Sequence, residues 1–304
     1  MPETEIKRGM KSWILAARPK TLPAAVVPVW VGAMPLLLDG DPGTGSWLLF
    51  WCTLASCICI QVATNLFNDA IDDEKGADTK ERIGPRRVTA SGLLSRKAVM
   101  AGAFGFCALA AAIATPIIGA HGWPIIAIGA LSLFFAYGYT GGPFPLAYLG
   151  LGELFVILFF GFVAVLGSYF VQAGNLGEGD LFLWLLGLQC GLYSSVLIAI
   201  NNLRDVDEDR QSGKRTLAVR FGKKFARIEI ALFGYLPLVP LAIVAPLSAF
   251  GLPAVVILAA LHLVITSRIW KTEPSMAYNR FLALAALQLI LFAIAISVIF
   301  VTMK

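Results

Sequence analysis

Charged residues are scarce in this chain of 304 amino acids. Only 14% of the residues are Asp, Glu, Lys or Arg, whereas 58% are hydrophobic. A soluble domain carries roughly 25% charged residues, because its surface faces water. The shortage argues against a soluble protein. Apolar stretches long enough to cross a bilayer, which needs about 20 residues, recur along the whole chain and predict an all-α, polytopic membrane protein.

Cysteine pairs and histidine clusters are lacking as well. The two histidines, His121 and His262, lie far apart in the sequence, and neither has another typical zinc ligand beside it. The five cysteines form no CxxC motif and lie inside apolar stretches: Cys52, Cys57, Cys59, Cys107 and Cys190. We expect them to be small buried side chains, not disulfides or metal ligands.

Hydropathy and helix breakers predict nine membrane-spanning helices. They form a single transmembrane domain over residues 21–304, preceded by a juxtamembrane segment at residues 1–20. The connection at residues 121–124 is short enough to be a kink, which would leave eight spans. The predicted spans are 21–38, 47–68, 98–120, 123–140, 153–173, 181–203, 228–249, 252–270 and 281–303.

The distribution of charge favours nine spans. With nine spans, every one of the 24 basic residues except the terminal Lys304 lies on one side of the membrane. The charged residues of the loops on the opposite side are all acidic. Because basic loops face the cytoplasm, the amino terminus is expected to be cytoplasmic. The net charge of +5 then belongs to loops beside anionic lipid headgroups and indicates no nucleic-acid surface.

Two polar clusters stand at the ends of the second and sixth spans. In the first, Asn65, Asn68, Asp69 and Asp72 are spaced i, i+3, i+4 and i+7 and therefore share one face of a helix. Asp78 follows Gly76, where we expect the helix to have ended.

The second cluster repeats this pattern, with Asn201, Asp205 and Asp209 stepping by four residues and Asn202 beside them. Four crossings separate the two spans, so both clusters emerge on the same side. Facing carboxylates at a membrane surface repel each other unless cations pair with them. Hard oxygen ligands favour Mg²⁺. An ordinary solvated helix end explains one such cluster well, but two with matching spacing poorly.

Basic side chains next to both clusters are suited to phosphate oxygens. They are Arg82, Arg86, Arg87, Lys214 and Arg215. Together the clusters predict a site for magnesium and a diphosphate group. The off-face charges Asp73, Glu74, Asp207 and Glu208 are expected to be solvated.

At these residues the chain resembles the UbiA superfamily of intramembrane prenyltransferases. The family pattern of NxxxD with a further Asp matches Asn68, Asp72 and Asp78, and its DxxxD matches Asp205 and Asp209. The resemblance implies nine helices around a central cavity, and transfer of an isoprenoid chain from its diphosphate to an acceptor. Four stretches, beginning at Trp13, Asn65, Tyr139 and Asn201, are most similar to the 1,4-dihydroxy-2-naphthoate polyprenyltransferases of menaquinone synthesis.

The resemblance also implies roles for individual residues. Asn68, Asp72, Asp205 and Asp209 would bind Mg²⁺, and Asp78 would complete the catalytic acidic set. Substrates, polyprenyl diphosphate and the aromatic acceptor, would contact basic, amide and aromatic side chains: Arg82, Lys214, Arg215, Asn65, Asn202, Tyr139 and Arg18. Asp69 and Asn201 are candidates for an outer layer of ligands. In a prokaryote the protein would lie in the cell (inner) membrane, with its active site facing the cytoplasm.

Several alternatives stay open. The acceptor could be another aromatic compound or a polar lipid, with the same metal site. A cation transporter is disfavoured because such proteins place their charges at mid-membrane. For Arg18, an anchor at the membrane interface is the simpler explanation, whereas Glu153 either binds the acceptor or stabilises the start of a helix.

Overall fold

The computed structural model describes residues 3–39, 45–77, 83–176 and 181–303, and in these ranges it contains helices and no strands. The helices are α1 (Glu3–Ala17), η1 (Pro19–Thr21), α2 (Pro23–Leu37), α3 (Trp47–Glu74), α4 (Arg96–Ile113), α5 (Thr115–His121), α6 (Trp123–Gly138), α7 (Gly152–Val156), η2 (Ile157–Val163), α8 (Ala164–Ala173), α9 (Leu181–Arg204), α10 (Val206–Gln211), α11 (Leu217–Tyr235), α12 (Leu238–Val244), η3 (Ala245–Leu247), α13 (Gly251–Lys271) and α14 (Tyr278–Thr302).

Each of the nine predicted segments is helical. Among the described residues, seven helices are long and apolar enough to span a membrane, and an eighth is obtained if the pair formed by residues 9–21 and 23–37, bent by 51°, is one span. The remaining predicted span is α6, which is apolar but has only 16 residues. The all-helical fold is therefore confirmed, and seven to eight spans are supported by length and composition.

The connection between α5 and α6 is a turn and not a kink. Arg96, at the start of α4, pairs with Glu74 at the end of α3, and Thr140, just after α6, accepts a hydrogen bond from Lys75. The start of α4 and the end of α6 therefore lie beside the same end of α3, so the chain reverses between them. Gly122, with a φ of 70°, is at the break.

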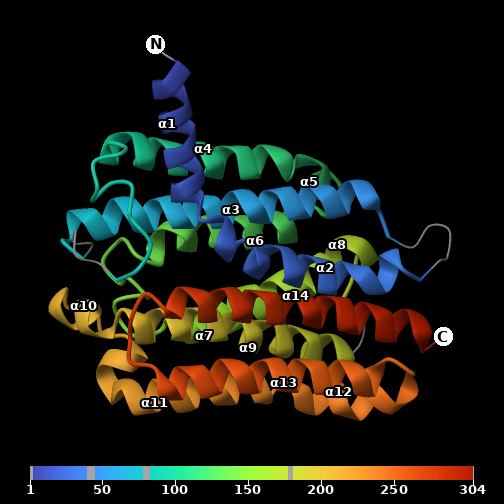
Figure 1. Cartoon of the computed structure of the whole chain (residues 1–304). Helices are drawn as coiled ribbons and strands as arrows, with labels where there is room; N and C mark the ends of the chain where they lie inside the picture. Colours follow the sequence, from blue (N-terminus) through green and yellow to red (C-terminus); the bar gives the residue numbers. More distant parts are fainter. Residues whose placement is uncertain (1–2, 40–44, 78–82, 177–180, 304) are drawn as a thin grey trace.

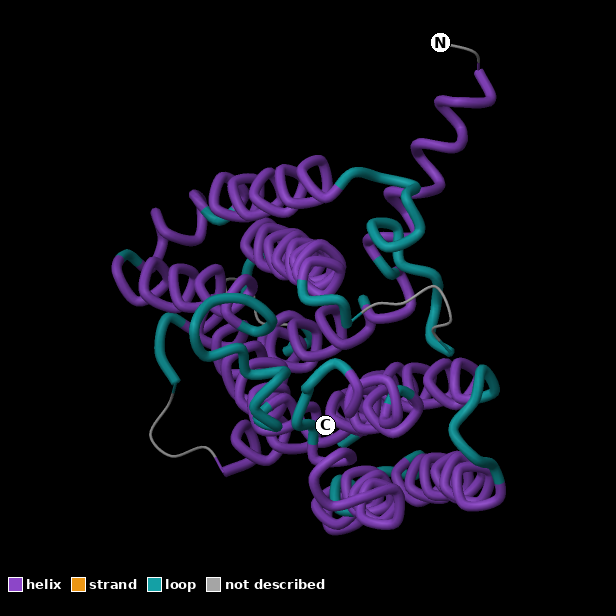
Figure 2. The backbone as a smooth tube through the Cα atoms, turned by 90° about the vertical axis from the view of Figure 1, so that its left-hand side faces the viewer, coloured by secondary structure: helices purple, strands orange, loops and turns teal. Residues whose placement is uncertain are grey.

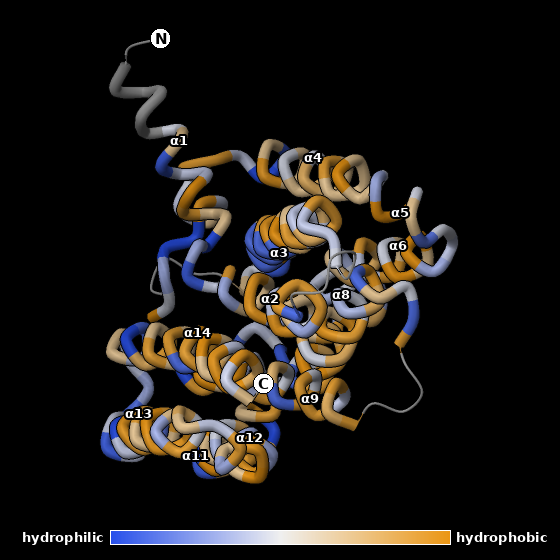
Figure 3. Tube along the Cα trace, turned by 90° about the vertical axis from the view of Figure 1, so that its right-hand side faces the viewer, coloured by the Kyte–Doolittle hydropathy of each residue, from blue (hydrophilic) through white to orange (hydrophobic). Residues whose placement is uncertain are grey.

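The long helices run side by side, with the connections after α3 and α9 and between α13 and α14 at one end of the bundle and the carboxyl terminus at the other (Figure 1). The first helix, α1, projects from the bundle (Figure 2). Hydrophobic residues predominate along the helices, whereas α3 also carries a hydrophilic stretch (Figure 3). This arrangement brings the two polar clusters to the same end.

The middle of the bundle is held by close contact between α9 and η2, which is a π-helical segment. A Cβ atom on Gly161 would lie 2.6 Å from the carbonyl oxygen of Gly187, and one on Gly191 would lie 2.9 Å from Ile157. Only glycine allows the two backbones to approach this closely. A π-helical segment inside an α-helix is common at functional sites, and this one forms part of a cavity wall.

A cavity of about 940 Å³ lies within the bundle. Residues from α1 to α10 and from α14 line it, and among the described residues α11, α12 and α13 contribute none. Helix α11 instead packs against α9, α13 packs against α14, and α12 packs against α13. The fold thus divides into a cavity-forming part and a solid carboxyl-terminal part.

Candidate active site

The polar clusters of α3 and α9–α10 face the same cavity. The last residue of α3 is Glu74, and the chain turns at Gly76, whose φ is 66°. All four polar residues from Asn65 to Asp72 therefore lie within the helix. The cavity is lined on one side by Asn65, Asn68, Asp69 and Asp72, and on the other by Asn201, Asn202, Asp205 and Asp209. Residues about 130 positions apart in sequence are thereby brought into one site.

Asp72 is at the centre of the contacts between the two clusters. Its side chain is buried, with 3% of its surface exposed. The Tyr148 hydroxyl donates to Oδ1 at 2.8 Å, and the Lys214 Nζ lies 3.0 Å from Oδ2. The same Nζ is 4.0 Å from Oδ1 of Asp209. A single cationic group therefore contacts carboxylates from the ends of both helices.

Asp205 is paired with a buried arginine. Nε of Arg204 donates to one carboxylate oxygen at 2.6 Å and Nη2 to the other at 2.7 Å. The guanidinium also donates to Asn201 at 2.6 Å and to Asn279 at 2.8 Å. The two-pronged contact fixes the Asp205 carboxylate and balances its charge in a buried position. Each carboxylate oxygen still has lone pairs for another ligand.

Two residues of the α3 face hold neighbouring segments in place. Asp69 accepts hydrogen bonds from the backbone N–H groups of Val88 and Thr89 and from the Thr89 hydroxyl, which ties the loop before α4 to α3. Asn65 donates to the Ala17 carbonyl at 2.9 Å and to the Thr21 hydroxyl at 3.0 Å. Both side chains face the cavity, but these contacts already give them a structural role.

Asn68 and Tyr148 are fixed by the loop between α6 and α7. The Thr140 hydroxyl donates to the Asn68 side-chain oxygen. Lys75 and Lys214 lie over the Tyr148 ring, 4.1 and 5.0 Å from its centroid. Burial and the neighbouring Asp72 raise the pKa of Tyr148, so its hydroxyl stays protonated and donates. Burial lowers the pKa of Lys75, and Asp72 opposes this shift only in part.

The predicted site residues differ in how the structure places them. Lys214, Arg18, Asn202 and Tyr139 line the cavity together with the acidic clusters. Arg215 is exposed and absent from the lining, and its carbonyl accepts a hydrogen bond from Arg220. Asp78 and Arg82 lie outside the described residues.

Four residues of the site were not singled out by sequence reasoning: Tyr148, Lys75, Arg204 and Thr140. Arg204 and Lys75 lie inside the two motif stretches. Their positive charge beside the motif's acidic residues was the one signal that could have identified them. Tyr148 and Thr140 lie in the glycine-rich loop after α6, more than 70 residues from the Asp72 and Asn68 that they contact. Their hydroxyls carried no spacing signal.

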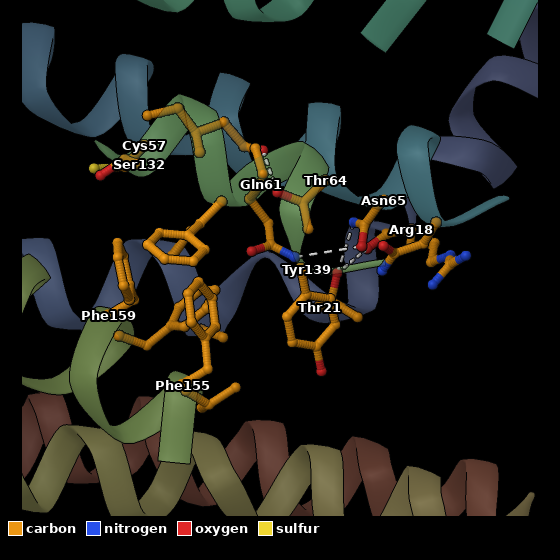
Figure 4. Close-up of a pocket in the computed structure, with 18 of the residues that line it drawn as sticks. Arg18, Thr21, Cys57, Gln61, Thr64, Asn65, Ser132, Tyr139, Phe155 and Phe159 are labelled. Atoms are coloured by element: carbon orange, nitrogen blue, oxygen red, sulfur yellow. Dashed lines mark hydrogen bonds between the residues drawn. The ribbon is translucent and has the colours of Figure 1, made fainter. Parts of the chain in front are cut away.

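Deeper in the cavity the lining becomes aromatic and then apolar. Tyr139, Phe155 and Phe159 lie on one side, opposite the polar residues of α3 and the α1–α2 connection (Figure 4). The Phe155 and Phe159 rings are stacked at 4.3 Å, and Tyr139 is 5.4 Å from Phe155. Beyond them the lining is formed by isoleucines of α5 and α6: Ile117, Ile118, Ile125, Ile126 and Ile128. A long apolar group fits this part.

The polar end is suited to a divalent ion that is shared with a phosphate group. Within the described ranges, no three Asp, Glu, His or Cys side chains converge closely enough to hold a metal ion on their own. Mg²⁺ commonly needs only one or two carboxylates, because waters and substrate phosphates complete its shell. Asp72 and Asp209, drawn to one ammonium group, and the nearby Asn68 amide oxygen supply that donor set.

The chain is similar in sequence to known proteins over most of its length. Residues 25–301 match the model of the UbiA prenyltransferase family. The 1,4-dihydroxy-2-naphthoate octaprenyltransferase of Haemophilus influenzae is 34% identical over 229 residues, which cover 73% of each protein. The Escherichia coli protein of the same name is 36% identical over 237 residues, covering 75% of this chain and 73% of that one.

The fold also has a solved counterpart. The structure of a UbiA homolog from Archaeoglobus fulgidus bound to DMAPP and Mg²⁺ superposes with a TM-score of 0.61 at 16% identity. The match covers 94% of this chain and 99% of the other. At this identity the likeness concerns the fold.

Proposed function

The chain belongs to the UbiA prenyltransferase family, and on this premise we propose that it transfers a polyprenyl group from polyprenyl diphosphate to 1,4-dihydroxy-2-naphthoate. With loss of the acceptor's carboxylate as CO2, the product would be demethylmenaquinone in its reduced, quinol form, in menaquinone biosynthesis. The names of the relatives that are 34–36% identical support this acceptor. The observation that carries the proposal is the Lys214 ammonium between Asp72 and Asp209, since it joins the two acidic helix ends in one cavity.

The diphosphate of the donor would bind at this polar end. Asn68, Asp72, Asp205 and Asp209 are the residues that would hold Mg²⁺ there. The Archaeoglobus fulgidus homolog, which is bound to DMAPP and Mg²⁺, supports the choice of this ion. When bound, the ion stabilises the negative charge that the diphosphate gains as the allylic C–O bond breaks. Asp78 and Arg82 belong to the same proposed set on sequence grounds.

The basic side chains of the chain itself would bind the phosphate oxygens. Lys214 is within reach of both acidic clusters, and Arg87 lies 3.9 Å from Asp72. Tyr148 and Arg204 would orient Asp72 and Asp205 by the hydrogen bonds described above. The donor would thus find its charge balanced before the reaction begins, which lowers the barrier to ionisation.

The remainder of the cavity would hold the prenyl chain and exclude water. Its apolar lining suits a hydrocarbon, and an allylic cation in a wet site would be captured by water. Phe155, Phe159 and Tyr139 offer aromatic faces that stabilise a cation nearby. Prenyl transfer needs both parts of this cavity: a charged end that binds the diphosphate and an apolar interior that excludes water.

We place the protein in the bilayer with nine spans, the bent α1–α2 pair and the short α6 included. The basic connections after α3 and α9 and between α13 and α14 lie at one end of the bundle, as a cytoplasmic face would require. The amino terminus and the active site would then face the cytoplasm, in the cell membrane of a prokaryote.

A product assay tests the proposed function. Purified protein would receive Mg²⁺, polyprenyl diphosphate and, in parallel, 1,4-dihydroxy-2-naphthoate, 4-hydroxybenzoate or homogentisate, with products identified by mass. We expect prenylation of the naphthoate, and loss of activity when EDTA removes Mg²⁺. Transfer to 4-hydroxybenzoate in preference would contradict the acceptor, and activity in EDTA would contradict the metal.

A further inference from the structure

Glu153, in the first turn of α7, has an open hydrogen-bonding position inside the cavity. Only 2% of its surface is exposed, and it belongs to the cavity lining. Oε1 accepts a hydrogen bond of 2.7 Å from the Asn202 side chain. Oε2 is buried and has no hydrogen-bond partner within the described residues. The carboxyl group is therefore held on one side and unoccupied on the other.

A buried carboxyl group in this state is energetically unfavourable. An unpaired polar atom away from water costs about 1–3 kcal/mol, and more if the group is charged. Ser168 and Ser194 also line the cavity, with hydroxyls that find no hydrogen-bond partner in the described part of the chain, but a neutral hydroxyl tolerates this better than a carboxylate. The arrangement at Glu153 is stabilised when a ligand brings a hydrogen-bond donor to Oε2.

The surroundings of Glu153 suit a flat aromatic ligand. Tyr139 packs against the start of α7, since a Cβ atom on Gly152 would lie 3.0 Å from its hydroxyl oxygen. The Tyr139 ring is 5.4 Å from that of Phe155, on the same helix as Glu153. Asn202 belongs to the second polar cluster, one helical turn before Asp205. The carboxyl group thus lies between an aromatic wall and the proposed diphosphate site.

We propose that Glu153 is a catalytic residue that binds a ring hydroxyl of the acceptor and removes its proton. This inference rests on the proposed function and names the group that activates the acceptor. Asn202 would hold Oε1, so that Oε2 alone points to the hydroxyl. The acidic residues of the two motifs remain assigned to the magnesium–diphosphate group, so proton removal from the acceptor falls to Glu153.

The proposed step removes a proton from the acceptor and joins its ring to the allylic carbon. The O–H bond breaks, its proton goes to Oε2 of Glu153, and its electron pair forms a ring C=O. The ring then supplies the electron pair of a new C–C bond to the allylic carbon. The allylic C–O bond breaks at the same time, and its electron pair leaves with the diphosphate. The ring carboxylate then leaves as CO2, its electron pair restores the aromatic ring, and the carbonyl oxygen regains the proton from Glu153. Proton removal raises the electron density of the ring when attack requires it.

The test compares Glu153→Gln with wild-type enzyme. The substitution preserves size and the acceptor oxygen for Asn202 but cannot take a proton. We expect turnover to fall by about 100-fold or more, with the KM for polyprenyl diphosphate unchanged. Glu153→Asp, which keeps a carboxyl group, should recover part of the lost turnover.

A binding measurement separates a catalytic from a structural role. For wild-type protein, methylation of the hydroxyl that Glu153 binds should weaken binding of the naphthoate by about tenfold, since Oε2 loses its donor. Both monomethyl ethers would be tested as competitive inhibitors. In Glu153→Gln this preference for hydroxyl over methoxy should disappear, which a loss of folding or packing would not produce.

Glu273→Gln is the matched control. Glu273 is also a glutamate, but it lies in the connection between α13 and α14, pairs with Arg227 at 2.8 Å and is not among the described residues that line the cavity. Its substitution should leave turnover and the hydroxyl preference unchanged. Wild-type turnover in Glu153→Gln, or an unchanged preference for the hydroxyl over the methoxy compound, would overturn the role of Glu153 and leave the proposed function standing. Absence of naphthoate prenylation by the wild-type protein would instead contradict the proposed function.

Discussion

Two groups of buried polar side chains in this molecule differ in whether their hydrogen bonds are complete. In the carboxyl-terminal part, the fully buried His262 lies 3.1 Å from the Gln288 side-chain oxygen and 3.3 Å from the Ala231 carbonyl. Gln288 in turn donates to the Leu258 carbonyl. In the cavity, Glu153 keeps an oxygen that has no hydrogen-bond partner among the described residues, and Lys214 is shared between two carboxylates.

At these two places the difference separates polar groups that pack helices from polar groups that line a cavity, although an unpaired atom alone is no sufficient sign, since Nε of Arg227 on α11 is also buried without a hydrogen-bond partner among the described residues. Those around His262 join α11, α13 and α14 to one another and leave no room, since Gly234 lies directly against the imidazole ring. Those of the cavity hold positions and charges that a substrate can complete. Burial of a polar residue in a membrane protein is therefore a weak guide to function until its partners are known.

The largest effect on activity is expected from Asp72→Asn, which removes the charge that contacts Lys214 but keeps the shape of the side chain. We expect turnover to fall by about 100-fold or more, because the diphosphate site loses a central ligand. Thermal unfolding should change little by comparison. Near-wild-type turnover would remove Asp72 from the catalytic set.

Gly234→Ala should lower stability and leave turnover nearly unchanged, the reverse of Asp72→Asn. The added Cβ atom would lie 1.9 Å from the His262 ring, so the helices must shift. Overpacking of this kind destabilises a protein by about 1–3 kcal/mol. We expect a lower midpoint of thermal unfolding, with turnover of the folded protein at low temperature nearly unchanged. A large loss of turnover without loss of stability would break the comparison between the two regions.

Tyr148→Phe tests a contact of intermediate strength. It removes the hydroxyl that donates to Asp72 at 2.8 Å while the ring beneath Lys75 and Lys214 remains. Loss of one hydrogen bond to a charged group, about 1.5–3 kcal/mol, predicts roughly a 10- to 100-fold fall in turnover. Steady-state kinetics with varied Mg²⁺ would measure it, and a fall confined to stability would indicate that Tyr148 only packs.

Thr140→Val should have the smallest effect. It deletes the hydroxyl that orients the Asn68 amide but leaves that amide in place. With a neutral hydrogen bond worth about 0.5–1.5 kcal/mol, turnover should fall by roughly 2- to 10-fold. A change larger than that in Tyr148→Phe would show that Asn68 matters more than Asp72 for the bound ion.

The sequence predicts the helical face of α3 well because the i, i+3, i+4, i+7 spacing depends only on helix geometry. Contacts that depend on where the chain leaves a helix are harder to predict. The side chains of adjacent residues on a helix point in different directions. Arg204 nevertheless donates a hydrogen bond to Asp205, because the backbone of Asp205 has left the regular helix, with φ −94° and ψ 10°. The seventh predicted span begins at residue 228, whereas the helical segment extends further back to Leu217 and is broken at Gly222, where φ is 86° and ψ is 170°.

The most direct test of the central claim is a double-mutant cycle between Asp72→Asn and Asp209→Asn, with prenyl transfer as the readout. If the ends of α3 and α10 bind one magnesium–diphosphate group, the double variant should lose far less activity than the product of the two single losses. Losses that multiply independently would show that the two carboxylates serve separate sites, and would contradict the account.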